Sequence, residues 1–142
     1  MSGRERALRI VLRLVGAVSA LAVVPIFVPR AWMDAAHSAL GLGELPTGPV
    51  VGYLARSASV LYAMYGGLLL WLSTDVPRNR SAIAYMAWAM ACAGVALFGI
   101  DLAEGLPAWW VLGEGPVVSA IGVAMIALLR GVPVEDSASR DG

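Results

Sequence analysis

A single arginine inside a long apolar run is the residue of this sequence best placed to do chemistry. Residues 49–73 hold no charged side chain other than Arg56. A guanidinium costs about 2.5 to 3.5 kcal/mol at the centre of a membrane-spanning helix unless it is paired, so the sequence predicts a partner. The threading predicted below brings three acids to the same end of the molecule, Asp101, Glu104 and Glu114. Asp101 is the preferred partner because apolar residues flank it on both sides.

Three interpretations of this set stay open. In the first, Arg56 and an acid form a structural ion pair that fixes the register of two helices. In the second, a ligand-binding pocket opens towards the outer leaflet and receives an anionic or quinone-like headgroup. Its lining would combine Arg56 with Tyr53 and Ser59 of the same helix and with the three acids. In the third, the arginine side chain extends to the membrane interface without a partner.

Asp34 and His37 form the only acid and imidazole pair at helical spacing. Because they lie three residues apart, the carboxylate is positioned to orient the ring. The chain has one histidine, and no motif places a serine or cysteine nucleophile beside it. A polar face on a helix at the interface therefore explains the pair more simply than a catalytic site does.

Composition gives no support to other chemistry. The ten basic residues are all arginine and balance ten acids, with no basic cluster of the kind that binds nucleic acid. The single cysteine, Cys92, lies in an apolar run, and one histidine cannot complete a metal-ligand set. The sequence contains no phosphate-binding, zinc-protease, haem or dinucleotide motif. No metal or cofactor is expected, and an enzymatic activity is not favoured.

The chain is too apolar for a soluble domain and reads as an all-α integral membrane protein. Hydrophobic residues make up 59% and charged residues 14%, where soluble domains carry about a quarter charged residues. The pattern predicts a four-helix bundle as one domain over residues 1–134, followed by a disordered polar tail over residues 135–142. The four predicted spans cover residues 10–28, 50–73, 82–100 and 116–129.

Two further features shape the predicted bundle. Residues 31–40 place apolar side chains at helical spacing, which indicates a short outer helix at the interface between the first and second spans. Small residues recur along one stripe of the second span, at Ala55, Ser59, Ala63 and Gly67, and along one stripe of the third, at Ala84, Ala87, Ala91 and Gly94. Such stripes let helices approach closely, so the second and third spans are predicted to pack as an antiparallel hairpin.

Arginine placement predicts the orientation. Four spans put both termini on one side, and eight of the ten arginines fall on that side, in the leader, in the turn after the second span and in the tail. Because positive charge is retained in the cytoplasm, both termini are predicted to be cytoplasmic.

The layout resembles the DoxX-like group of small four-helix bacterial membrane proteins. The likeness lies in a first span ending in proline, an outer interfacial segment, ARSASVLYAMYGGLLLWLSTDVPRNR across the second span and turn, a small-residue third span ending in GIDLAEGLPAWW, and a short fourth span. It implies a bacterial inner-membrane location. Some members of that group are linked to quinone-dependent oxidation as accessory membrane subunits, which would make Arg56 a headgroup contact here.

Three function classes remain open from the sequence. The first is a non-enzymatic subunit or scaffold that packs against a membrane partner or another copy of itself. The second is a binder of a lipid or quinone-like amphiphile in the outer-leaflet pocket near Arg56. The third, an oligomeric transporter, ranks last because the middle of each predicted span is apolar and small.

Overall fold

The computed structural model describes residues 2–132, which form helices with no strand among them. The predicted polar tail, residues 135–142, lies outside the described residues. The helices in chain order are α1 (Gly3–Ala20), α2 (Val23–Phe27), α3 (Arg30–Ala39), α4 (Pro49–Leu72), α5 (Arg80–Ala103), α6 (Ala108–Gly113) and α7 (Gly115–Leu129).

Each predicted span coincides with a helix, but two differ in extent. The first span is interrupted at residues 21–22, shortly before Pro25, which cannot donate the hydrogen bond that would continue the helix. The fourth span was predicted to begin at residue 116, but helix already begins at Ala108 in α6 and breaks only at Glu114. The short outer helix was correctly predicted within a residue at each end, as α3.

Three stretches are long and apolar enough to cross a membrane, Gly3–Phe27, Arg80–Ala103 and Ala108–Leu129. The helix α4 is not among them, although it has 24 residues. Its arginine, serines and tyrosines keep it from reaching the hydropathy of these three stretches. The predicted four spans are therefore three by length and composition.

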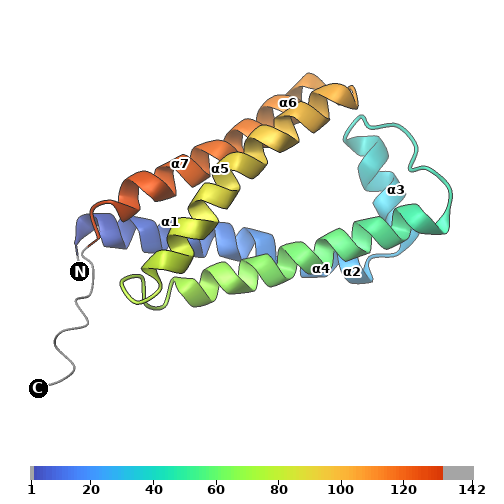
Figure 1. Cartoon of the computed structure of the whole chain (residues 1–142). Helices are drawn as coiled ribbons and strands as arrows, with labels where there is room; N and C mark the ends of the chain where they lie inside the picture. The colour runs from blue at the N-terminus through green and yellow to red at the C-terminus, as the bar shows by residue number, and fades with distance from the viewer. Residues whose placement is uncertain (1, 133–142) are drawn as a thin grey trace, which may run out of the picture.

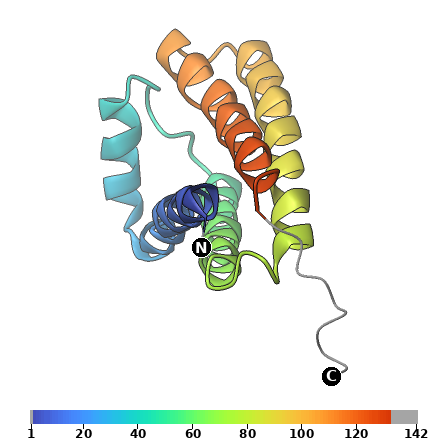
Figure 2. The same ribbon diagram turned by 90° about the vertical axis from the view of Figure 1, so that its left-hand side faces the viewer.

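The long helices form two pairs that meet at one end and diverge towards the other (Figures 1 and 2). In one pair α1 and α2 pack against α4, and in the other α5 packs against α7. The helices α4 and α5 barely touch, so the predicted hairpin between the second and third spans is wrong. We call the meeting end the apex and the other the open end, near which α3 lies (Figure 1).

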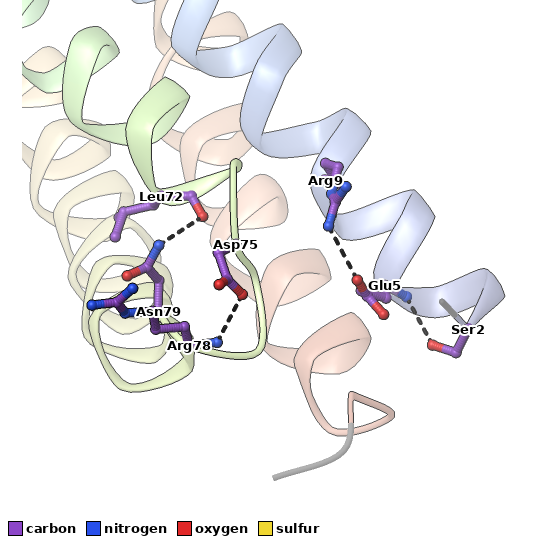
Figure 3. A network of polar contacts seen from close by, with 7 residues as sticks. All are labelled: Ser2, Glu5, Arg9, Leu72, Asp75, Arg78 and Asn79. Atoms are coloured by element: carbon purple, nitrogen blue, oxygen red, sulfur yellow. Dashed lines mark hydrogen bonds and ion pairs between the residues drawn. The ribbon is translucent and has the colours of Figure 1, made fainter. Parts of the chain in front are cut away.

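The hydrophobic core lies at the apex and joins the two pairs. It combines side chains from α1, α4, α5 and α7 with those of the connecting segments, namely Leu8, Leu12, Leu69, Leu72, Val76, Ile83, Ala87, Met90, Met125, Leu129 and Val132. Short polar contacts secure the chain around this core (Figure 3). Ser2 caps the first turn of α1, and Asn79 binds the Leu72 carbonyl to fix the turn between α4 and α5.

Each helix pair is held by close backbone contact at glycines. Between α1 and α4, a Cβ added to Gly66 would lie 2.5 Å from the carbonyl oxygen of Gly16. Between α5 and α7, a Cβ on Gly94 would lie 2.5 Å from the amide nitrogen of Ser119, and one on Gly122 would lie 2.5 Å from that of Ala91. The stripe predicted on the third span is thus a packing surface, but its partner is α7.

We expect Gly66→Ala to destabilise the folded chain and Gly67→Ala to leave it unharmed. The methyl group at residue 66 has no room against α1, which costs about 1 to 3 kcal/mol. A methyl at residue 67 meets nothing within 4 Å, and alanine favours helix by up to about 1 kcal/mol over glycine. Thermal unfolding of both variants in the same detergent measures the difference. Equal melting temperatures would contradict the observed α1–α4 contact.

Candidate functional site

Arg56 binds the end of another helix rather than an acid. Its Nε donates to the carbonyl oxygen of Ile26 at 3.1 Å, and its Nη2 donates to that of Val28 at 3.2 Å. These carbonyls lie at the carboxyl end of α2, where helix carbonyls lack partners and carry partial negative charge. Arg56 therefore ties α4 to the point where the chain leaves α2.

A second arginine, Arg30, also donates to two backbone carbonyl oxygens. Arg30, the first residue of α3, donates from Nη1 to the carbonyl oxygen of Gly48 at 3.0 Å and from Nη2 to that of Pro46 at 2.6 Å. A Cβ added to the buried Gly52 would lie 3.4 Å from Nη1 of Arg56 and 4.0 Å from Nη1 of Arg30. The two guanidinium groups thus converge over Gly52 and fasten both ends of the α3 segment to α4.

The three acids predicted to neutralise Arg56 do not reach it. Among residues 2–132 the single ion pair is Arg9 with Glu5, at 3.2 Å, near the apex. Asp101 is 3% exposed, and its Oδ2 has no hydrogen-bond partner in the described chain. Glu104 is exposed at the end of α5, and Glu114 accepts a hydrogen bond from the indole Nε1 of Trp110. The ion pair predicted between Arg56 and Asp101 is not formed.

The other two residues predicted to line the pocket, both in the described chain, form no hydrogen bond with Arg56. Tyr53 is 68% exposed, and Ser59 donates to the carbonyl oxygen of Ala55 in its own helix at 2.8 Å. The described residues contain no group of three or more metal-ligating side chains. The residues predicted to form one pocket, all within residues 2–132, thus lie on α4 and at the ends of α5 and α6, with no hydrogen bond or ion pair between any two of them.

Asp34 and His37 each bind the loop after α3 instead of each other. The carboxylate oxygen Oδ1 of Asp34 accepts from the amide of Leu45 at 2.9 Å, and His37 Nδ1 lies 3.0 Å from the carbonyl oxygen of Gly43. Gly43 has a φ of 82°, in the region that favours glycine, which lets the loop fold back to these side chains. The pair shapes this loop, and no catalytic arrangement surrounds it in the described chain.

The contacts of Arg30, and those of a further arginine at the apex, were not predicted from the sequence. Arg80, at the start of α5, donates from Nη1 to the carbonyl oxygens of Leu129 and Val132, both at 2.6 Å. Each of these arginines begins a helix and bonds to backbone carbonyls far along the chain. The position of an arginine at a helix start was the one available signal.

We expect Arg56→Met to destabilise the chain by about 2 kcal/mol, because it removes charge-assisted hydrogen bonds and leaves two carbonyls without a donor. Arg78→Met is the control, since only the backbone amide of Arg78 makes a hydrogen bond there. Thermal unfolding in detergent compares them. An Arg56→Met variant as stable as the control would exclude a structural role for this guanidinium.

We expect Asp101→Asn to raise stability by about 1 kcal/mol, because a neutral amide of the same shape is less costly to bury than a carboxylate without a partner. Glu104→Gln, at an exposed position three residues on, should change stability by less than about 0.5 kcal/mol. Parallel thermal unfolding at neutral pH checks both. A loss of stability in Asp101→Asn would show that the carboxylate makes a favourable interaction.

No protein-family model, curated protein or solved structure compared with this chain matches it, and the likeness to the DoxX-like group stays a prediction from the sequence.

Proposed function

We propose that this chain is a non-enzymatic integral membrane protein that crosses the membrane four times and serves as a subunit or scaffold for another membrane chain. Three candidate spans support the membrane placement. The helix α4 packs along α1, and its 24 residues extend about 36 Å at 1.5 Å each, enough to cross beside it. The bacterial inner membrane is the compartment that the DoxX-like resemblance implies.

The proposed orientation places the apex in the cytoplasm. The described arginines of the apex are those of α1, of the turn before α5 and of the end of α7, whereas Arg30 and Arg56 lie towards the open end. Positive charge is retained on the cytoplasmic side, which favours this orientation. Labelling of Thr47→Cys but not of Asn79→Cys by an impermeant maleimide in intact cells, in a Cys92→Ala background, would agree with it.

One apolar face of α4 is buried at the apex and exposed along the rest of the helix, which favours a partner. Leu72, Tyr65, Leu61 and Leu54 follow one another at spacings of seven, four and seven, which keeps them on one side of the helix. Leu72 is fully buried and Tyr65 half-buried, but Leu61 is 66% and Leu54 58% exposed. The face that joins the two helix pairs at the apex therefore continues, uncovered, towards the open end.

On the other helix pair, one face of α5 is likewise buried at the apex and exposed towards the open end. On α5, Ile83 and Met90 are buried at the apex, Leu97 is half-buried and Glu104 is exposed, at a regular spacing of seven. A helix of another chain, or of a second copy, seated between the pairs would cover the apolar part of both faces. The exposed apolar side chains on these two faces are the feature that favours a subunit over a self-sufficient bundle.

The contacts of Arg56 favour a structural role over a headgroup contact. Its Nε and Nη2 already donate to the chain, and Arg30 is similarly engaged. Both arginines hold the α3 segment against the start of α4, which fixes the shape of the open end. A scaffold needs such a fixed shape if a partner is to recognise it.

The test is site-specific photocrosslinking in membranes of the native cells. A photoreactive amino acid at residue 61 should give one discrete protein adduct, because Leu61 lies on the uncovered face. The matched control is residue 60, which is 41% exposed but points about 100° away around the helix. Alkaline extraction of the same membranes checks that the chain is integral.

The adduct mass identifies the partner. Twice the mass of the chain would mean a second copy, and another mass a different subunit. Equal adducts from residues 60 and 61, or lipid adducts alone from both, would refute the scaffold proposal. Extraction of the chain by alkali would refute the membrane placement instead.

A further inference from the structure

A groove on the α5–α7 pair near the apex has features that the proposed scaffold role does not use. It encloses about 200 Å³ and is lined by Arg80, Ala84 and Trp88 of α5, with Ile126, Leu129 and Arg130 at the end of α7. Because Trp88 lies two helical turns beyond Arg80, the groove runs from a charged end to an apolar one over about 12 Å.

Two guanidinium groups line the charged end of the groove, and a third, that of Arg4, lies next to it at the end of α7. Arg80 bridges the Leu129 and Val132 carbonyls with Nη1, which leaves Nε and Nη2 without a protein acceptor in the described chain. Arg130 is exposed beside it. Arg4 packs on Gly131, where an added Cβ would lie 2.8 Å from its Nη1. No described acid forms an ion pair with any of the three.

We propose that this groove binds one anionic glycerophospholipid, with its phosphate at Arg80 and Arg130 and an acyl chain along Trp88 and Ile126. Basic pockets between helices at the cytoplasmic face suit anionic headgroups. The inference rests on the membrane placement proposed above and is independent of the partner between the helix pairs.

The apolar half of the groove selects a lipid over a free phosphate. Ala84 is small enough to leave room between the helices, while Trp88, 59% exposed, offers a broad ring to the acyl region next to the interface. A soluble anion would use the arginines alone and gain nothing from these side chains. Lipid binding therefore has two signatures, dependence on charge and dependence on groove volume.

Native mass spectrometry of the full chain in detergent tests the site. The probes are dioleoyl phosphatidylglycerol, dioleoyl phosphatidylcholine and inorganic phosphate. Arg130→Gln removes a charge that makes no hydrogen bond to the described chain, and Ala84→Phe fills the groove without changing any charge. Arg78→Gln, an exposed arginine outside the groove, is the control.

We expect wild-type protein to bind phosphatidylglycerol about tenfold more tightly than phosphatidylcholine, and Arg130→Gln to lose about tenfold in affinity for it, as for one charge-assisted contact. Ala84→Phe should show a similar loss, and Arg78→Gln none. Circular dichroism checks that each variant is folded.

Two results would overturn the lipid site. Equal affinity for the two lipids in every variant would remove the role of the arginines. Competition by inorganic phosphate, with unchanged affinity in Ala84→Phe, would reduce the site to an anion site. Either result with the chain still integral to membranes refutes the groove alone, whereas loss of membrane integration refutes the placement on which it rests.

Discussion

Contact between backbones at glycine positions is the interaction on which the rest of this structure depends. In a lipid environment apolar side chains gain little by leaving lipid for a neighbouring helix, so helices associate through close van der Waals packing instead. Gly66 of α4 against α1, Gly94 of α5 against α7, and Gly122 of α7 against α5 provide that proximity. These contacts decide which helices pair, and the pairs in turn decide the two-armed shape. The side chains of the apex core join the two pairs.

Hydrogen bonds from guanidinium groups to backbone carbonyls hold further segments of the chain together. Arg56, Arg30 and Arg80 each bridge two carbonyl oxygens at or next to a helix end, far along the chain. A planar group with five donors suits this task, because it satisfies two acceptors at once and leaves donors over. The chain uses arginine in this way at both ends of the molecule. An arginine within a long apolar helix is thereby accommodated without a carboxylate.

Much of the secondary structure could be predicted from the sequence, and the pairing of helices could not. Prolines, glycines and apolar periodicity predicted α3, α4, α5 and α7 within a few residues, but they placed the start of the first helix at residue 10 instead of Gly3 and missed α6. The small-residue stripe with Ala87, Ala91 and Gly94 identified a packing face correctly, but periodicity carries no information about which helix covers that face. On α4 the stripe was assigned to Gly67, whereas the contact is made by Gly66, one position and about 100° away.

The predicted site failed for a different reason. A charge in an apolar run suggests an opposite charge, and only acids can be recognised as such in a sequence. Backbone carbonyls accept equally well where a helix ends, but every residue has one, so composition cannot show which is available. For the same reason the contacts of Arg80 could not be predicted, since its acceptors are backbone carbonyls about fifty residues ahead.

The two ends of the molecule are built for different neighbours. At the apex, buried leucines and methionines leave no room between the helix pairs, so a molecule that binds there must lie on the outside, as in the α5–α7 groove. Towards the open end the inner faces of α4 and α5 are uncovered, so a partner can lie between the pairs. Because the glycine contacts fix each pair separately, occupation of one place does not require rearrangement of the other. The proposed lipid on the outer groove and the proposed protein between the pairs are therefore compatible with each other.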